Sequence, residues 1–270
     1  MPALFSADIR KMIEYFEEID STNKRAEIIG KNGAEEFSFA AASIQNSGRG
    51  RSGRSWSSGT PDGLYFSVVL RPGMNVDKVS MLTLVMANSI CRFFETLGID
   101  CQIKWPNDLV INGKKICGIL TECFFDEKIK DPEKPAFFLV TGVGINFNNP
   151  SFEKELADKA TSVFLETGKR INVDDKEHRI DIIGKILKFF REDYESVLGF
   201  GNLSPIINKY NEKSVNVDSR VRILDPKGEY EALSLGITPE GALKVMTDDG
   251  QIKEITSGEV SVRGILGYAK

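Results

Sequence analysis

The sequence lacks several features that would place it in a membrane or on nucleic acid. It has no run of about 18 apolar residues, so no membrane-spanning helix is expected. The first residues, Met1 to Asp8, show no basic segment followed by an apolar one, so no secretory signal peptide is expected. Basic residues are not in excess, because 35 Lys and Arg face 39 Asp and Glu for a formal net charge of -4. We therefore expect a cytoplasmic protein that binds neither membranes nor, in general, nucleic acid.

Residue types that bind metals are also scarce. Histidine occurs once, as His178, in the charged start of an expected helix where it should be solvated, which disfavours a Ser–His–Asp hydrolase. The four cysteines form no CxxC pair and lie in apolar segments, at positions 91, 101, 117 and 123. Free buried thiols in a reducing compartment are the expected state, and no protein metal site is expected.

The length of the chain, 270 residues, and its apolar content, 41%, are enough for one large domain and a small second one. Patterns of apolar residues predict strands over residues 12–19, 37–44, 64–70, 101–125 and 136–147. Apolar residues at three- and four-residue spacing predict two long helices, from Val79 to Leu97 and from Ile180 to Val197. A short helix is expected over Lys24 to Ile29, and Asn112-Gly113 is expected to be a hairpin turn.

The character of the sequence changes near residue 214. From there, turn residues recur at intervals of roughly 10 residues between short apolar segments, a pattern typical of a small all-β barrel. The expected domains are therefore residues 1–213 and 214–270.

Residues 46–61 form a long segment without periodicity, which we call the arginine loop. It contains Arg49, Arg51, Arg54 and Trp56 among glycines and serines, with no acidic residue between them. Arginine forks and exposed backbone N–H groups suit a phosphate or carboxylate, and Trp56 could stack on a flat ring. A solvated flexible loop and an arginine–glycine segment for nucleic acid are the competing interpretations.

Two nucleotide-binding motifs are excluded for this loop. Gly48 to Gly53 formally matches GxGxxG, but the following Arg-Ser-Trp-Ser-Ser-Gly-Thr-Pro is no helix start, as a dinucleotide-binding fold would need. No Gly-Lys-Ser/Thr closes the loop either, so it is not a phosphate-binding P-loop.

Two further segments combine polar groups with strand ends. Lys104-Trp-Pro-Asn-Asp108 follows an apolar strand, and its proline fixes a turn that presents polar side chains, although an ordinary strand end would have the same composition. Gly142-Val-Gly-Ile-Asn146 contains glycines that would allow a ligand close to the backbone, or would mark a bulge.

Together these segments resemble the biotin–protein ligase family. Its motif GRGRxGRxW is present as Gly48 to Trp56, KWPND as Lys104 to Asp108, and GIL-x-E as Gly118 to Glu122. Its G-x-GIN is Gly142 to Asn146, and the Ser-Thr-Asn that opens its first helix is residues 21–23. The resemblance runs from about residue 13 to 147 and returns at residues 258–263. Lipoate–protein ligases, a related branch, lack the arginine motif.

The resemblance implies an α+β fold, in which a mixed β-sheet flanked by helices (the class II synthetase-like catalytic domain) precedes a small SH3-like β-barrel. It implies ATP-dependent activation of biotin to biotinyl-5'-AMP, with Mg²⁺ accompanying ATP. The biotin is then transferred to a lysine of a biotin carboxyl carrier protein. A homodimer is left open.

The resemblance also implies roles for individual residues. The implied biotin-binding residues are Ser21, Thr22, Asn23, Gln45, Gly48, Arg49, Arg51, Lys104, Gly118, Leu120 and Gly142. The implied ATP- and adenylate-binding residues are Arg49, Arg51, Arg54, Trp56, Lys104, Asn107, Gly144 and Asn146, the last also serving Mg²⁺. Lys104 and Arg51 are the implied catalytic residues, because a carboxylate can attack a negative α-phosphate only where positive groups offset the repulsion.

The sequence departs from the family pattern in two places. The approach to the loop reads Ala42-Ser-Ile-Gln-Asn-Ser, so the role of Gln45 depends on its distance from Gly48. Only 20 residues precede Ser21, too few for a helix-turn-helix domain, so we expect a ligase that does not bind DNA. A biotin-sensing repressor without catalysis is the remaining alternative from another functional class.

Overall fold

The structure is a computed structural model, and it describes residues 12–125, 137–225, 228–256 and 261–264. The chain divides into two compact units. The first contains residues 1–79, 117–151 and 162–188, and the second contains residues 80–116, 152–161 and 189–270. Because neither unit is continuous in sequence, they differ in kind from the expected domains 1–213 and 214–270, and that boundary stays a prediction.

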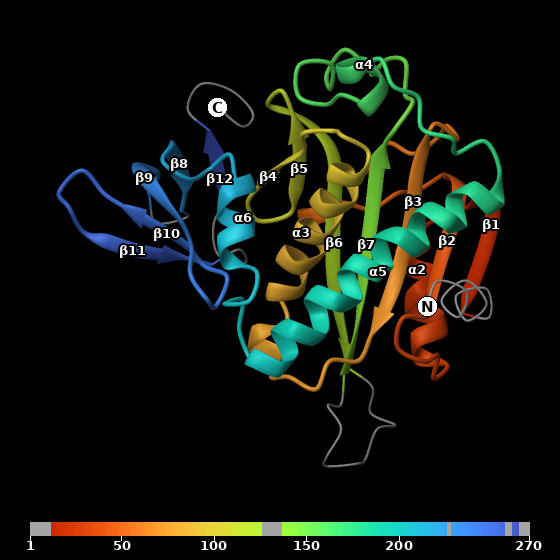
Figure 1. The fold of residues 1–270 in the computed structure, drawn as a ribbon, viewed down its shortest axis with the longest axis horizontal. Coiled ribbons are helices and arrows are strands. Elements are labelled where there is room, and N and C mark those ends of the chain that lie inside the picture. Colours follow the sequence, from red (N-terminus) through yellow and green to blue (C-terminus); the bar gives the residue numbers. More distant parts are fainter. Residues whose placement is uncertain (1–11, 126–136, 226–227, 257–260, 265–270) are drawn as a thin grey trace. The chain divides into compact units, whose positions relative to one another are not determined.

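The first unit is built on strands β1 (Ile13–Ile19), β2 (Phe39–Gln45), β3 (Gly63–Leu70), β7 (Phe137–Asn146) and β6 (Lys114–Phe125), adjacent in that order (Figure 1). β6 enters this unit at Cys117. The β1–β2 pair is parallel, whereas β2–β3, β3–β7 and β6–β7 are antiparallel. The mixed sheet expected from the sequence is thus confirmed. Every residue of β3 and β7 is buried, as their apolar composition predicts.

Helix α2 (Thr22–Lys31) covers this part of the sheet. Ala26 and Ile29 of the helix form one apolar cluster with Ala40, Val69 and Phe138 of the strands, and with Val140. The helix includes the Lys24–Ile29 segment expected to be helical and extends beyond it at both ends. This unit also contains the short α4 (Val163–Thr167) and the first half of α5 (Lys176–Phe200).

The second unit contains helix α3 (Met81–Thr96), strands β4 (Gln102–Lys104) and β5 (Asp108–Ile111), the start of β6, the end of α5, and α6 (Ile207–Lys213). α3 and α5 confirm the two long helices expected from the apolar spacing. Asn112 and Gly113 have φ of 49° and 75°, as a two-residue hairpin turn between β5 and β6 requires.

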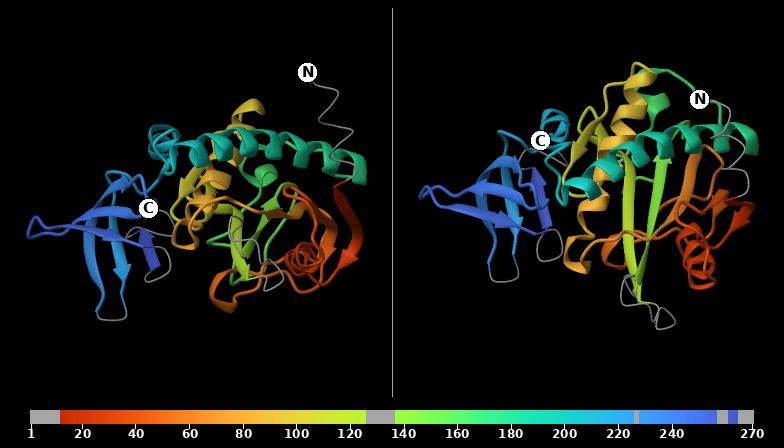
Figure 2. Two further views of the ribbon diagram at one scale, coloured as in Figure 1. Left: turned by 90° about the horizontal axis from the view of Figure 1, so that it is seen from below. Right: turned by 60° about the horizontal axis from the view of Figure 1, so that its bottom comes forward.

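The C-terminal part of the second unit is a five-stranded antiparallel sheet, visible from two sides in Figure 2. Its strands are β8 (Arg220–Leu224), β9 (Tyr230–Ile237), β10 (Leu243–Met246), β11 (Ile252–Ile255) and β12 (Ser261–Gly264), in the order β11-β10-β9-β8-β12. This arrangement is consistent with the SH3-like domain expected there. Residues 258–260 of the last matching segment lie outside the described residues.

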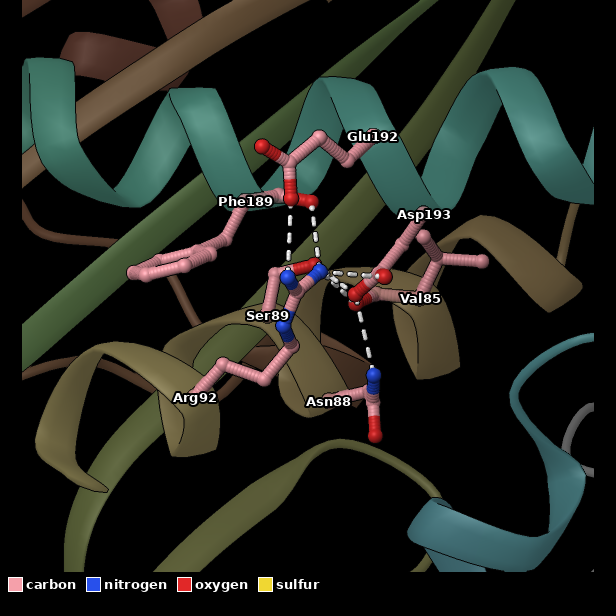
Figure 3. Close-up of polar contacts among 7 residues, drawn as sticks. All are labelled: Val85, Asn88, Ser89, Arg92, Phe189, Glu192 and Asp193. Atoms are coloured by element: carbon pink, nitrogen blue, oxygen red, sulfur yellow. Dashed lines mark hydrogen bonds and ion pairs between the residues drawn. The ribbon is translucent and has the colours of Figure 1, made fainter. Parts of the chain in front are cut away.

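A polar network centred on the buried Asp193 joins α3 to the end of α5 (Figure 3). Asp193 accepts hydrogen bonds from Asn88 Nδ2 at 2.9 Å and Arg92 Nη1 at 2.5 Å, and its Oδ2 lies 2.9 Å from Ser89 Oγ. Arg92 also contacts Glu192 at 2.8 Å. We call these five residues the α3–α5 network. Among the residues that the structure describes, no helix is both long and apolar enough to cross a membrane.

Candidate functional site

The Ser-Thr-Asn segment lies at the start of α2, with Ser21 as its N-cap residue. Ser21 has the extended backbone typical of this position, and its N–H donates to Asp20 Oδ1 at 2.8 Å. The three side chains are buried, with exposed fractions of 3%, 3% and 6% for Ser21, Thr22 and Asn23. Burying three adjacent polar residues is unfavourable unless they have hydrogen-bond partners.

Thr22 is bonded to Gln45 at the end of β2. Gln45 Oε1 accepts from the N–H of Thr22 at 2.8 Å and lies 3.0 Å from its hydroxyl. The Gln45 amide nitrogen in turn donates to Ser58 Oγ at 3.3 Å, and the Gln45 N–H donates to Ser58 O at 2.9 Å. Gln45 therefore connects the start of α2 with Ser58, which lies near the end of the arginine loop.

Asn23 bridges three strands. Its Oδ1 accepts from Ser67 Oγ on β3 at 2.6 Å, and its Nδ2 donates to Glu122 Oε2 on β6 at 2.8 Å. The same amide lies directly on β7, because a Cβ added to Gly142 would be 1.8 Å from Asn23 Oδ1. Only glycine fits at position 142 while Asn23 stays in place. Since Ser67 Oγ is also 2.7 Å from Thr22 Oγ1, one continuous chain of hydrogen bonds connects Glu122 with Ser58. We call this chain the α2–β network; its members are Glu122, Asn23, Ser67, Thr22, Gln45 and Ser58.

The backbone positions predicted to line a pocket are neighbours in the sheet. Gly118 pairs with Gly144, and Leu120 pairs with Gly142, across β6 and β7. Asn146 follows on β7, where it pairs with Gly63, and its side chain is 3% exposed. The register thus brings together five of the residues that the sequence singled out.

The arginine loop folds back on itself as a small hairpin, which is more order than its composition predicts. Gly50 N donates to Arg54 O at 2.7 Å, and Trp56 N donates to Gly48 O at 2.8 Å. Ser52, between them, has a φ of 55°. We call residues 48–56 the loop tip. Its backbone bonds at these positions are made within the tip itself.

The side chains of the loop tip differ in their contacts. Arg49 Nη2 lies 2.9 Å from Glu122 Oε1, so the loop reaches the α2–β network through an ion pair. Arg51 begins a single turn of 3-10 helix, and Arg54, which follows this turn, is exposed. Trp56 lies against β7, since a Cβ on Gly144 would be 2.4 Å from its Nε1. The sequence suggested that Gly142 and Gly144 admit a ligand. In this structure the side chains of Asn23 and Trp56 lie over them.

Where the chain leaves the loop, residues 60–63 are held from inside the protein. We call these four residues the loop exit. Arg179, from the first turn of α5, donates to Gly63 O at 2.6 Å and to Pro61 O. Tyr65 Oη donates to Thr60 O at 3.3 Å. Burial raises the pKa of Tyr65 to about 12, so the phenol stays protonated and able to donate at neutral pH.

The two remaining predicted residues, Lys104 and Asn107, belong to the second unit. Lys104 ends β4 and is 6% exposed, and Asn107 lies in the turn that leads to β5. The turn is fixed through Trp105, whose N–H donates to Asn216 Oδ1 at 2.8 Å and whose Nε1 donates to Gly241 O at 3.1 Å. The Lys104-Trp-Pro-Asn-Asp108 segment is therefore bonded to the C-terminal part of its own unit.

Several residues that build this site escaped the sequence analysis. Ser67 is the single hydroxyl residue in the strand Gly63–Leu70 besides Tyr65, and a lone small polar residue in a buried strand is a usable signal. Glu122 was noticed as part of a motif but without a role. In the second unit, Lys115 was also not noticed; it lies on β6 and forms an ion pair with Asp108 at 2.6 Å. Arg179 gave no signal, because it lies in a charged helix start.

The arrangement is suited to an anionic ligand. No cluster of three or more His, Cys, Asp or Glu side chains that could hold a metal ion occurs in the described part of the chain. What the first unit supplies is a set of buried hydroxyl and amide groups beside a loop with three arginines. The hydroxyl of Ser21 is buried and has no hydrogen-bond partner among the described residues, which leaves one polar group for a ligand.

Two family profiles match parts of this chain. The sequence profile of the biotin/lipoate A/B protein ligase family matches residues 15–146, and that of the biotin protein ligase C-terminal domain matches residues 218–263. The chain is 34% identical over 251 residues to the bifunctional ligase/repressor BirA of Bacillus spizizenii, covering 92% of this chain and 73% of that protein. It is 27% identical over 231 residues to the biotin–[acetyl-CoA-carboxylase] ligase of Paracoccus denitrificans, covering 83% of this chain and 90% of that one.

A solved structure is similar over nearly the same length. The biotin protein ligase from Aquifex aeolicus in complex with biotin and ATP superposes with a TM-score of 0.76 at 30% identity, covering 93% of this chain and 98% of that one. The same protein without ligand gives a TM-score of 0.71 at 26% identity.

Proposed function

Because the chain belongs to the biotin/lipoate A/B protein ligase family, we propose that it activates biotin with ATP and transfers the biotinyl group to a lysine of a carrier protein. The observation that supports this most is the α2–β network, which places buried hydroxyl and amide groups of Thr22, Asn23 and Gln45 in one chain. The ureido group of biotin has one carbonyl and two N–H groups, and it requires acceptors and donors of this kind. Ser21 supplies a further buried hydroxyl.

Positive groups make the first step feasible. A carboxylate oxygen of biotin attacks the α-phosphorus of ATP, the bond to the β-phosphate bridge breaks, and pyrophosphate leaves. Both reactants are negative, so Arg49, Arg51 and Lys104 lower the barrier by offsetting their repulsion. Arg49 is paired with Glu122 at 2.9 Å, and a ligand anion therefore has to compete with this carboxylate for the guanidinium.

The nucleotide is assigned to two residues of the loop tip and to two asparagines outside it. Trp56, which lies on Gly144, would stack on or wall the adenine, and Arg54, Asn107 and Asn146 would contact the nucleotide. Mg²⁺ would arrive with the phosphates of ATP, which leave it needing only one or two protein oxygens. The amide oxygen of Asn146 is the donor assigned to it, and Mg²⁺ would supply charge neutralisation there.

The second step needs the adenylate to survive. Biotinyl-AMP is a mixed anhydride and is prone to hydrolysis, so closure of the arginine loop over it would exclude water. The amine of the carrier lysine then attacks the acyl carbon and AMP leaves. The acceptor is a biotin carboxyl carrier protein in this proposal. No general base for the lysine amine is assigned.

Two lysines are candidates for the catalytic role. Lys104 is proposed because it ends a buried strand in a motif of the family, and its exposed fraction of 6% suits a charge that acts away from water. Lys115 is the alternative, because it lies on β6, the strand that also carries Gly118 and Leu120. Substituting each lysine separately by glutamine decides between them.

The proposed function is tested by the exchange of pyrophosphate into ATP in the presence of biotin. In parallel control reactions, biotin is replaced by lipoate or left out. We expect exchange with biotin and little with lipoate, because the arginine motif is complete. Transfer of labelled biotin to a purified carrier domain follows, with the acceptor lysine replaced by arginine as the control. Exchange that is as fast with lipoate as with biotin would assign the protein to the lipoate branch instead.

Three properties of the whole protein belong to the same proposal. We infer a cytoplasmic location, since the four cysteines are free thiols, as expected in a reducing compartment.

We infer no specific DNA binding, because the net charge is -4 and the one basic cluster is assigned to the ligand. A gel shift with biotinyl-AMP on biotin-operon promoter DNA tests this, and a protected site with nanomolar affinity would refute it. Sedimentation with and without biotinyl-AMP tests the homodimer.

A further inference from the structure

At the start of the arginine loop, Asn46 N donates to Ile19 O and Ser47 N donates to Asp20 O, both at 2.9 Å. The loop exit is likewise held by groups outside the loop. All four of its carbonyls accept hydrogen bonds from outside the loop. Thr60 O accepts from Tyr65 Oη, Asp62 O from Asn148 N at 2.9 Å, and both Pro61 O and Gly63 O from Arg179. The backbone bonds of the loop tip, in contrast, close on the tip itself.

Arg179 is an unusual residue for the first turn of α5. It is 1% exposed, although the neighbouring His178 and Lys176 on the same helix turn are exposed. A leucine or methionine would fill such a position without the cost of burying a charge. The guanidinium offsets this cost with charge-assisted bonds to two carbonyls of the loop exit.

The position of the loop exit matters for the proposed ligand contacts. Two residues before it, Ser58 bonds to Gln45, which bonds to Thr22. Four residues before it, Trp56 lies against Gly144. A shift of the loop exit would displace both Ser58 and Trp56. Ser58 is bonded to Gln45, which is assigned to biotin, and Trp56 is itself assigned to adenine.

We propose that Arg179 is a positioning residue for the arginine loop: it fixes the loop exit, so that only the loop tip moves when the adenylate binds. The proposal rests on the proposed function for what the loop closes over. Arg179 contacts no reacting atom in this account. It acts by limiting the conformations of the ligand-free loop, which lowers the entropy cost of ordering the loop on the ligand.

The main test replaces Arg179 by methionine, which keeps an unbranched apolar stem and removes the charge and the donors. We expect biotinyl-AMP to dissociate about tenfold faster, the change expected for loss of a charge-assisted contact. Arg179→Lys keeps the positive charge but offers one donor nitrogen in place of the two that bond the loop exit, so its effect should be smaller than that of Arg179→Met. Ile183→Ala is the matched control, because Ile183 is fully buried on the same helix and the substitution removes packing only.

A second measurement does not depend on ligand. Trypsin cleavage after Arg54 in the ligand-free protein should be several-fold faster in Arg179→Met than in the natural protein or in Ile183→Ala at equal folded fraction. If Arg179→Met does not fold, Tyr65→Phe removes another bond to the loop exit and should raise the cleavage rate by a smaller factor. If the natural protein makes no adenylate, the proposed function is refuted. The cleavage rates of the ligand-free proteins would still test the role of Arg179.

The proposal is overturned if folded Arg179→Met releases biotinyl-AMP at the natural rate and is cleaved at the natural rate. It is also overturned if Ile183→Ala gives the same increases, because Arg179 would then matter only for the stability of α5.

Discussion

Among the described residues, two polar networks with buried members are alike in chemistry and differ in what holds them. In the α3–α5 network, Asp193 is contacted by Asn88, Ser89 and Arg92, all from regular helices. In the α2–β network, Glu122 is contacted by Asn23 from a helix and by Arg49 from a loop. The Asp193 carboxylate is 10% exposed, whereas the Arg49 side chain is 46% exposed.

We infer from this difference that the α3–α5 network is structural and that the α2–β network belongs to a binding site. An ion pair between two packed helices cannot open without disrupting the helices, so its loss should reduce stability. A pair with one partner on an exposed loop can exchange that partner for a ligand at small cost. Directly before Thr22 of the α2–β network, Ser21 has a buried hydroxyl with no partner among the described residues. We therefore expect substitutions in the first network to change stability and substitutions in the second to change ligand handling.

The largest effect is expected for Asp193→Ala. Removing this carboxylate leaves the Arg92 guanidinium and the Asn88 amide without their main acceptor, which should lower the free energy of unfolding by about 3–5 kcal/mol. Urea denaturation measures the loss, and Glu192→Ala, at the exposed end of the same network, is the control with little effect. An adenylation rate that falls in Asp193→Ala at full folded fraction would argue against a purely structural role.

Lys104→Gln should leave stability and biotin affinity little changed and slow adenylation. If Lys104 faces the charge that develops on the α-phosphate, the loss belongs to the transition state and should be roughly 10²–10³-fold in rate. Calorimetry with biotin and single-turnover kinetics separate binding from chemistry. The control is Lys115→Gln. A large loss in Lys115→Gln with a normal rate in Lys104→Gln would transfer the catalytic role to Lys115.

Arg51→Ala should release biotinyl-AMP faster without unfolding the protein. The residue lies on the loop tip, so the change in stability should be within about 0.5 kcal/mol. A charge-assisted contact with the adenylate is worth about 1.5–3 kcal/mol, and the off-rate should rise accordingly. Arg51→Lys keeps the charge and should show a smaller increase. An unchanged off-rate in Arg51→Ala would remove this residue from the site.

The smallest effect is expected for Glu122→Gln. The pair that it forms with Arg49 is partly exposed, so the loss of stability should stay under about 1 kcal/mol. The glutamine can still accept from Asn23 but no longer attracts Arg49, so the ligand-free loop tip should be cleaved faster by trypsin. Saturating biotinyl-AMP should abolish the difference. Equal cleavage of both proteins without ligand would show that the ion pair does not hold the loop.

The sequence predicted the elements whose signals are local and long. The helix from Val79 to Leu97 repeats its apolar residues over several turns, and the Asn112-Gly113 turn has its own backbone requirement, so α3 and the β5–β6 hairpin were found. Short elements such as α4 (Val163–Thr167) and α6 (Ile207–Lys213) have too few turns to show a period. The two compact units were not foreseen, because each is assembled from three separate segments.

The site was predicted less completely than the fold. Motifs pointed to Asn23, Gln45 and the arginines, and the register of β6 and β7 brings the predicted glycines side by side. The partners Ser67 and Arg179 were missed, because their importance depends on which distant residue lies opposite them. The role of the glycines was also incomplete: Gly142 makes room for Asn23, a contact between residues that are far apart in sequence.

The most direct test of the central comparison is biotin-dependent pyrophosphate exchange by two asparagine variants, Asn23→Ala and Asn88→Ala. Each removes a buried amide from one of the two networks, and the assay temperature is chosen so that both variants are folded. The account predicts that Asn23→Ala loses most of the exchange activity, whereas Asn88→Ala exchanges at the natural rate despite its lower stability. Equal exchange rates in the two variants, or a loss confined to Asn88→Ala, would contradict the assignment of the α2–β network to the ligand.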